Sequence, residues 1–162
     1  MAQIKINRDG TVEALVGSQD IGGGARTVVA ILTSRSFGYL PLNKINVKIG
    51  DSDLGWSAAS AGSGTTGALT KELGDAFRNV SKQLFDLVAA KLNVASGDLE
   101  IREGGVIGPK GKGGGMKWDD AAGLIKDSII GFAPTVVEPG YQWVVIREDG
   151  TMEQANEQEY KA

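Results

Sequence analysis

The sequence contains no cysteine and no histidine. A chain without these residues forms no disulfide, holds no iron–sulfur cluster or zinc ion through the usual ligands, and has no Ser-His or Cys-His nucleophile. Any catalysis would therefore have to use carboxylates, hydroxyls, lysines or a bound cofactor.

Long apolar runs and an excess of positive charge are also lacking. No segment approaches the ~18 to 20 apolar residues that a membrane span needs, and the first residues precede no apolar signal-peptide region. Seventeen basic and twenty acidic residues give a formal net charge of −3, which does not favour binding to nucleic acid. We therefore expect a soluble, cytoplasmic protein with no nucleic-acid or membrane partner.

The length and composition predict one compact unit. The chain has 162 residues, of which 41% are hydrophobic, so one core is expected. We predict a single domain over residues 1–150 and a polar tail over 151–162. The 24 glycines are about twice the average share of roughly 7%. They cluster in four predicted loops, at 17–24, 62–67, 104–108 and 111–115.

The first half of the chain carries clear periodic patterns. Alternation over 3–7 and 11–16, around the turn residues at 8–10, predicts a β-hairpin. The apolar run within 25–37 fits a buried strand or a buried helix, and its length together with Gly38 at its end favours a helix. Residues 42–49 alternate as in a half-buried strand.

The most regular pattern predicts a long helix over 67–92, where apolar residues recur at three- and four-residue steps. Beyond it we predict a small hairpin, a basic flexible loop, a short helix and a strand, over 99–107, 109–115, 118–126 and 141–146. The fold class is therefore α+β, with a mixed or antiparallel sheet of about five or six strands. The helices over 25–37 and 67–92 are expected to pack on one face of this sheet.

Three consecutive glycines, Gly22 to Gly24, precede the first predicted helix. Glycines let backbone amides approach a ligand closely, and a helix N-terminus carries partial positive charge. Arg26 adds a full charge. The pattern suits a phosphate or the polar edge of a pterin, although a short glycine run is more often simply a tight connection.

A second loop of small residues, 57–66, opens the long helix in the same way. Its hydroxyls and amides can serve as ordinary helix caps or as a cradle for a pyrophosphate. Taken alone, this loop fits the capping role better.

The order of the two loops and of the elements between them resembles the molybdopterin-binding subunit of the xanthine dehydrogenase and aldehyde oxidoreductase family, the molybdenum hydroxylases. In that family a hairpin leads to a glycine-rich loop, a helix, a strand ending in Gly-Asp-x-Asp, a small-residue loop and a long helix. The matching parts here are Gln19-Asp20-Ile21-Gly22-Gly23-Gly24-Ala25-Arg26-Thr27, 45–49, Gly50-Asp51-Ser52-Asp53, 57–66 and 67–92. The resemblance covers one segment of the subunit, about residues 3–146.

The resemblance implies that both loops wrap molybdopterin, or its dinucleotide form, with molybdenum. At the pterin end it implies Gln19, Asp20, Gly22, Gly23, Gly24 and Arg26. In the second cofactor loop it implies Gly62, Ser63, Thr65 and Thr66.

The resemblance also implies the chemistry and the partners. In the family, water activated at the metal oxidises an aldehyde or an N-heterocycle, and electrons leave through iron–sulfur and flavin partners. Those partners, and the remaining segments of the molybdenum subunit that share the cofactor, must here be other chains or domains. A homo-oligomer is possible as well.

Two departures from the family pattern matter. Gly23 stands where many members place a glutamine facing the metal, and the Gly-x-Gly-Glu motif with the catalytic glutamate is absent. We therefore assign no catalytic or metal-binding residue, and activity of this chain alone is not expected. The alternative is a non-catalytic binding or assembly module with the same fold, and a phosphate-ligand enzyme using Arg26 and Asp20 is a third hypothesis.

Overall fold

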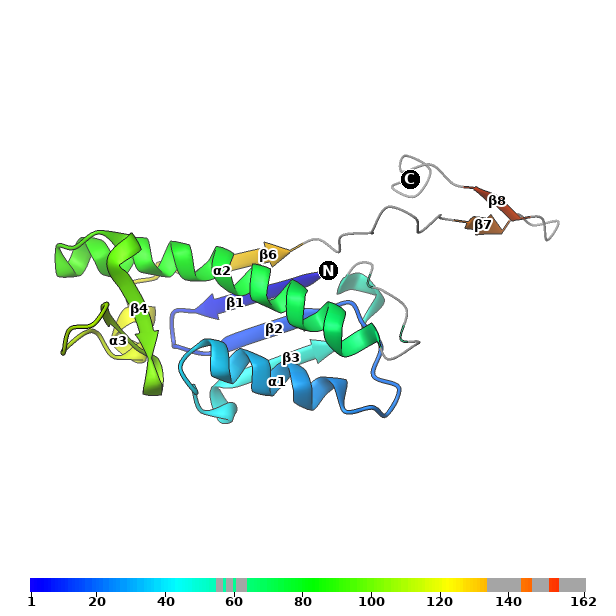
Figure 1. Ribbon diagram of the computed structural model, residues 1–162, viewed down its shortest axis with the longest axis horizontal. Coiled ribbons are helices and arrows are strands. Elements are labelled where there is room, and N and C mark those ends of the chain that lie inside the picture. Colours follow the sequence, from blue (N-terminus) through cyan, green and yellow to red (C-terminus); the bar gives the residue numbers. More distant parts are fainter. Residues whose placement is uncertain (55–56, 58–59, 61–63, 134–143, 147–151, 155–162) are drawn as a thin grey trace.

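The fold of the 162-residue chain is given by a computed structural model (Figure 1). The described residues are all except 55–56, 58–59, 61–63, 134–143, 147–151 and 155–162. The predicted site residues Gly62 and Ser63, the start of the strand predicted at 141–146, and most of the predicted tail lie outside the described residues.

Four strands form the main sheet, in the order β3-β2-β1-β6. β1 pairs antiparallel with both β2 and β6, whereas β2 and β3 are parallel, so the sheet is mixed. The predicted α+β fold with a mixed sheet is confirmed, but the sheet within the described residues has four strands rather than five or six. Their bounds are β1 Ala2–Asn7, β2 Val12–Val16, β3 Ile45–Ile49 and β6 Ser128–Ala133.

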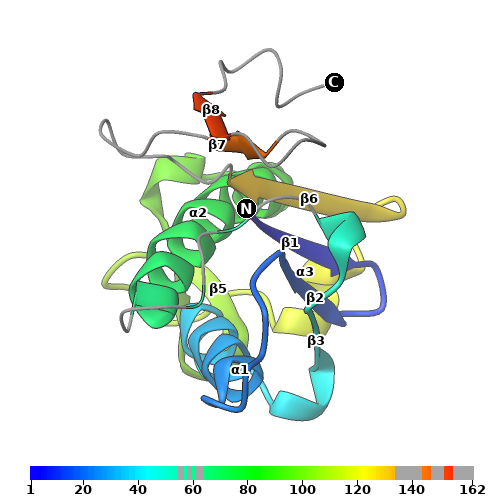
Figure 2. The same ribbon diagram turned by 90° about the vertical axis from the view of Figure 1, so that its right-hand side faces the viewer.

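Both main helices cover one face of this sheet, as predicted (Figure 2). α1 spans Ala25–Ser36 and α2 spans Gly64–Leu92. Alternate residues of the hairpin point toward the helices, because side chains of a strand alternate between the two faces. These buried residues are Ala2, Ile4, Ile6, Val12, Ala14 and Val16.

Strand β6 was not predicted, and its packing explains why. The alternation of this segment is broken by Gly131, which weakens the strand signal. A Cβ atom at Gly131 would overlap the Ala76 carbonyl oxygen and lie 2.8 Å from Val80 Cβ. Glycine is therefore required where β6 crosses closely beneath α2, a contact that is not visible in a local sequence pattern.

A second hairpin, β4 Leu99–Arg102 and β5 Val106–Pro109, lies beside the C-terminal half of α2 and is confirmed as predicted. The following basic loop was predicted to be flexible. In the structure, the Arg102 guanidinium donates to the carbonyls of Lys112, at 2.7 Å, and Gly114, and Lys110 Nζ donates to the Gly97 carbonyl at 2.7 Å. These bonds anchor the loop to its neighbours.

The boundaries of three predicted elements change. The strand predicted from residue 42 begins at Ile45, because Leu42–Lys44 forms a 3-10 turn after Pro41. The helix predicted over 118–126 is the shorter α3, Trp118–Ala122. Within the C-terminal region, β7 Val144–Ile146 pairs antiparallel with β8 Met152–Gln154, a strand inside the segment predicted to be a polar tail.

The buried Trp118 ties the far end of the first hairpin to α3. Its Nε1 donates to the Gly10 carbonyl at 2.7 Å, and its ring lies 5.0 Å from that of Phe37. Phe37 also contacts Phe77 edge to face, with ring centroids 5.0 Å apart. This aromatic group closes one end of the core. The loops that follow β2 and β3 lie at the opposite end of the sheet.

Candidate functional site

The two predicted binding loops leave the sheet at the same end, where β2 and β3 finish. One loop follows β2 and the other follows β3, and the carboxyl ends of two parallel strands lie side by side. The backbone N–H of Gly50, directly after β3, donates to the Ser18 carbonyl after β2 at 2.9 Å. The parallel pairing therefore starts both loops in contact.

The loops meet again farther out. Ser60 Oγ donates to Gln19 Oε1 at 2.9 Å and lies 3.5 Å from the Gln19 carbonyl oxygen. The structure thus brings a predicted residue of the first loop, Gln19, against the second loop. Ser60 itself was not among the predicted residues, and its neighbours in the small-residue segment give it no distinguishing signal.

The three consecutive glycines form an open approach to the N-terminus of α1. Gly22 and Gly24 have φ values of 93° and 78°, a left-handed conformation that favours glycine. A Cβ atom at Gly22, Gly23 or Gly24 would have no heavy atom within 4 Å. The backbone at this loop is therefore accessible from outside.

The first turn of α1 has no side-chain cap. Gly24 occupies the N-cap position and no side chain bonds to the turn. The Gly22 N–H donates to Asp20 Oδ1 at 3.3 Å, which orders the start of the loop. Among the described residues no acceptor bonds the N–H groups of Gly23 and Gly24. Unpaired amides at a helix N-terminus are suited to an anionic group.

The Arg26 side chain reaches from the first turn of α1 to the neighbouring strand β3. Its guanidinium donates to the carbonyl oxygens of Val47 at 2.8 Å and Ile49 at 3.4 Å, on the outer edge of β3. Because these two carbonyls occupy the guanidinium, Arg26 connects the first turn of α1 to the sheet. A local sequence pattern cannot reveal this role, since the contact joins residues more than twenty positions apart.

Thr65 and Thr66 lie in the first turn of α2, which begins at Gly64 rather than after the predicted loop. The Thr66 carbonyl accepts a hydrogen bond from Thr70 Oγ1 at 2.8 Å. Both threonines therefore stand at the N-terminus of the long helix. The structure does not describe the two site residues predicted just before them, Gly62 and Ser63.

Ser18 is a further polar residue that the sequence did not single out. It is 1% exposed, and its Oγ has no hydrogen-bond partner among the described residues. A buried hydroxyl without a partner is costly, so such groups are often found where a ligand or water completes the site. Ser18 lies where the two loops begin.

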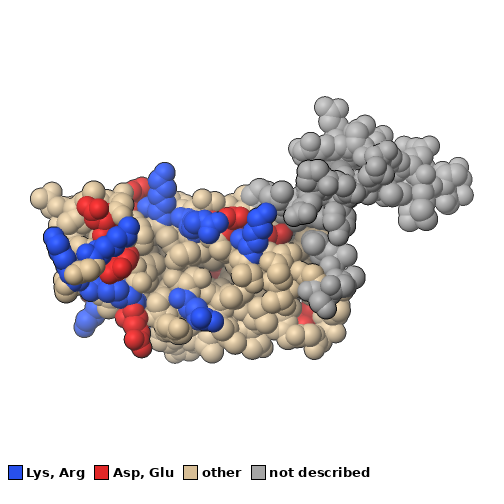
Figure 3. All heavy atoms as spheres, in the orientation of Figure 1, with Lys and Arg blue, Asp and Glu red and all other residues tan. Residues whose placement is uncertain are grey.

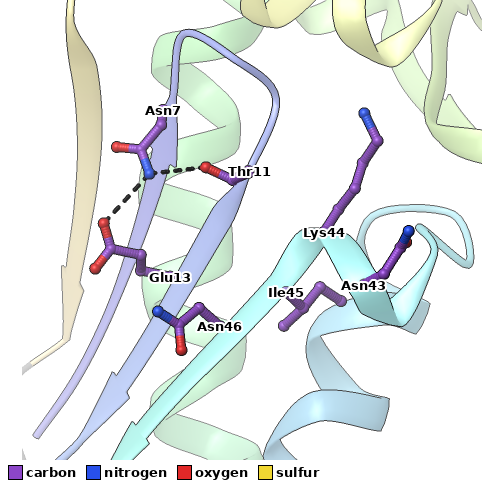
Figure 4. Close-up of a pocket in the computed structure, with 7 residues that line it drawn as sticks. All are labelled: Asn7, Thr11, Glu13, Asn43, Lys44, Ile45 and Asn46. Atoms are coloured by element: carbon purple, nitrogen blue, oxygen red, sulfur yellow. Dashed lines mark hydrogen bonds between the residues drawn. The ribbon is translucent and has the colours of Figure 1, made fainter.

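A separate cleft of about 340 Å³ lies at the opposite end of the strands (Figure 4). Glu13 is its central charge and accepts hydrogen bonds from Lys48 at 2.7 Å, Lys5 at 3.0 Å and Asn7 at 3.2 Å. These bonds, with that from Lys48 the strongest, lower the pKa of Glu13 to about 2. The cleft contains none of the predicted site residues. Its Glu13 carboxylate, on β2, is already bonded to Lys5 and Asn7 of β1 and to Lys48 of β3, so it connects these three strands.

The part of the chain that the structure describes contains no group of three or more acidic, histidine or cysteine residues placed to hold a metal ion. None of its helices is long and apolar enough to cross a membrane.

Comparison with known proteins links this geometry to a family. The model of a molybdopterin cofactor-binding domain matches residues 1–160. Comparison with well-characterised protein sequences gives no significant match.

Solved structures share the fold. Quinoline 2-oxidoreductase from Pseudomonas putida 86 aligns with a TM-score of 0.66 and 19% identity over 82% of this chain. Reconstituted CO dehydrogenase from Oligotropha carboxidovorans aligns with a TM-score of 0.65 and 22% identity, again over 82% of this chain. The carbon monoxide-reduced Cu,Mo-CO dehydrogenase aligns with a TM-score of 0.64 and 23% identity over 81% of this chain. The chain spans only 18–19% of the length of these structures.

Proposed function

The chain belongs to the molybdopterin cofactor-binding domain family, and we propose that its two loops hold molybdopterin as one segment of a molybdenum hydroxylase. The observation that carries this proposal is the contact between Ser60 and Gln19, which joins the two loops beyond the carboxyl ends of β2 and β3. Two loops that meet can hold one ligand between them.

The residues present fit such a cofactor. The amides of Gly23 and Gly24 and the uncapped first turn of α1 are suited to a pyrophosphate or to the polar edge of a pterin. The Ser18 hydroxyl, where the two loops begin, is buried without a partner among the described residues. When bound, the cofactor supplies the redox-active metal, which the pterin's own sulfur atoms hold, so the protein needs no cysteine or histidine ligand.

Each part of the chain then has a separate task. Gln19 and Ser60 fix the spacing of the loops, and Asp20 orders the glycines through the Gly22 amide. Arg26 acts as a positioning residue, because its guanidinium bonds β3 instead of facing the loop. The second loop would bind the cofactor from the other side, through residues before α2 and in its first turn. These residues are Gly62, Ser63, Thr65 and Thr66.

We propose that other chains or domains complete the enzyme. This chain corresponds to about a fifth of the length of its structural relatives and lacks the glutamate motif, so the remaining molybdenum-subunit segments would supply the catalytic glutamate. With no cysteine in the sequence, iron–sulfur and flavin partners would carry the electrons away. The substrate would be an aldehyde or an N-heterocycle.

A second candidate function is a non-catalytic binding or assembly module of the same fold. The glycine at position 23 and the missing glutamate motif favour it. Such a module would bind the same partner chains but would contain neither pterin nor molybdenum after purification.

The test is the cofactor content of the full chain, co-expressed with the proteins encoded beside it in a host that makes molybdopterin. Molybdenum is measured by elemental analysis and the pterin by fluorescence after oxidation. The Gly23→Val variant places a bulky side chain over the loop amides. Gly113→Val is the matched control, because both glycines have open space around the Cβ position and neither has a positive φ.

We expect pterin in the wild type and in Gly113→Val, and at least a tenfold loss in Gly23→Val. Equal pterin in both variants would contradict binding at this loop. Partner chains without pterin in the wild type would favour the assembly module.

A further inference from the structure

A groove of about 550 Å³ runs along α2, away from both cofactor loops. One wall is α2, and the other is formed by the end of α1, the 3-10 turn Ser96–Asp98 and β4. None of the residues that line it belongs to the proposed cofactor site. The lining residues are Ser36, Phe77, Arg78, Ser81, Lys82, Phe85, Ser96, Gly97 and Ile101.

The floor of the groove is a hollow between two aromatic rings. Phe77, Ser81 and Phe85 follow one another at four-residue steps, so they share one face of α2. The small Ser81 between two phenylalanines leaves space for another side chain, and Ile101 of β4 faces this space. Both phenylalanine rings are half-buried, and Phe37 packs against the Phe77 ring at 5.0 Å.

Ser81 provides an independent sign that the hollow accepts a guest. The residue is 5% exposed, and its Oγ has no hydrogen-bond partner among the described residues. An unmet buried hydroxyl costs free energy that a polar group of a bound chain can recover. An entirely apolar guest would leave this hydroxyl unpaired.

The rim of the groove is positively charged. Arg78 and Lys82 are exposed and one helical turn apart. Arg78 forms an ion pair with Asp75, whereas Lys82 has no ion pair within the described part of the chain. In Figure 3 basic side chains, with acidic ones between them, lie along the upper side of the molecule, above a largely uncharged area. A guest that carries carboxylates is therefore favoured at this rim.

We propose that this groove binds an extended acidic segment of a partner protein, with one aromatic or large aliphatic side chain seated over Ser81. Alternate residues of an extended chain lie roughly 6.6 Å apart on one side, close to the ~5.4 Å of one helical turn between Arg78 and Lys82. The peptide groups of the segment can also bond the Ser81 hydroxyl. The proposal concerns a different surface from the cofactor site, so each can fail without the other.

The probe is a short fluorescein-labelled synthetic peptide with a central phenylalanine between pairs of aspartate and glutamate. Binding to the full chain is measured by fluorescence anisotropy at low and at physiological salt. Lys82→Glu reverses a rim charge, and Lys71→Glu is the matched control, an exposed lysine of α2 outside the groove. We expect Lys82→Glu to weaken binding about fivefold or more, and Lys71→Glu to change it by less than about twofold.

Two further arms separate the outcomes. A peptide with alanine in place of phenylalanine should bind at least about tenfold more weakly, because the hollow loses its anchor. Ser81→Leu, which fills the hollow, should abolish binding, and circular dichroism checks that the variant folds. When the peptide is added, the amide NMR signals of Ile101 and Gly97, which line the groove, should change their chemical shifts.

Equal loss in both lysine variants, or equal binding of the alanine peptide, would reduce the effect to general charge attraction and overturn the proposal. Binding of 1-anilinonaphthalene-8-sulfonate in the groove without any peptide binding would assign it to small aromatic anions and would equally overturn it. If Ser81→Leu does not fold, the lysine pair and the alanine peptide still decide.

Discussion

The guanidinium of Arg26 donates hydrogen bonds to the carbonyl oxygens of Val47, at 2.8 Å, and Ile49, at 3.4 Å. This contact ties the first turn of α1 to β3, the strand at one edge of the sheet. The glycine loop immediately precedes that turn. The position of its amides therefore depends on a bond between a helix and a strand edge.

The opposite edge of the sheet is covered in a similar way. Asn79 and Gln83 of α2 donate to the carbonyls of Phe132 at 2.8 Å and Ile130 at 2.6 Å, both in the edge strand β6. Edge strands with unpaired backbone groups invite pairing with other chains. Helix side chains thus occupy backbone carbonyls at both edges of this sheet.

Removing the hydrogen bonds from Arg26 to β3 should increase the mobility of the glycine loop more than it destabilises the fold. We expect Arg26→Ala to lower the free energy of unfolding by about 1 to 2 kcal/mol, because two backbone hydrogen bonds to a charged donor are lost. Hydrogen exchange should rise at residues 17–24 and in β3. Arg35→Ala, the other arginine of α1, is the control. Equal exchange at 17–24 in both variants would show that Arg26 does not position the loop.

Opening the β6 edge should promote self-association. In the double variant Asn79→Ala and Gln83→Ala the carbonyls of Ile130 and Phe132 lose their donors, and both residues carry exposed apolar side chains. Light scattering coupled to gel filtration should detect larger species that increase with concentration. Asp86→Ala, an exposed substitution on the same helix, should not produce them. If the double variant elutes like the wild type, the amides do not protect this edge.

Gly131 should tolerate no side chain. A Cβ atom there would overlap the Ala76 carbonyl oxygen and crowd Val80, so α2 would have to move away from β6. We expect Gly131→Ala to cost about 3 kcal/mol or more in a urea titration, at the upper end of overpacking effects. Gly67→Ala, in open space within α2, should be neutral or stabilising by up to about 1 kcal/mol. Similar losses for both would contradict the close crossing of β6 under α2.

Glu13 should make the fold sensitive to acid in a defined range. Hydrogen bonds from Lys48, Lys5 and Asn7 lower its pKa from an ordinary value near 4.5 to about 2. A carboxyl whose pKa is lower in the folded state stabilises the fold above the unfolded pKa, and this stabilisation is lost as the pH falls from about 4.5 to about 2. Because Lys48 is half exposed, we expect only about 1 kcal/mol from this cluster.

The measurement is the urea midpoint of Glu13→Gln and of wild type between pH 2 and pH 7. The variant should be less stable at pH 7 and should converge with the wild type near pH 2. Glu103→Gln, an exposed carboxylate without an ion pair among the described residues, is the control. A constant difference across the whole range would show that Glu13 acts through packing rather than charge.

The sequence was sufficient for those elements whose signal is local and periodic. The alternation of the first hairpin and the long period of α2 follow directly from which side chains are buried. Strand β6 was missed because Gly131 interrupts its pattern to admit α2, a reason that lies on another element.

The site could be predicted only in part, for the same reason. The glycine loop is visible in the sequence, and the family resemblance led to both loops. The sequence could not show that Arg26 bonds β3, that Ser60 reaches Gln19, or that Ser18 is buried without a partner, because each depends on the parallel pairing of β2 and β3. Thr65 and Thr66 were placed in a loop because small polar residues favour caps and turns, whereas α2 begins before them.

Whether the two loops hold one ligand is tested by hydrogen exchange of the full chain with and without bound molybdopterin, in complex with its partner chains. If one ligand lies between the two loops, protection should appear in 17–24 and in 57–66 together, and in both to a similar extent. Protection confined to one loop, or absent from both while the pterin remains bound, would show that the two loops do not share the cofactor.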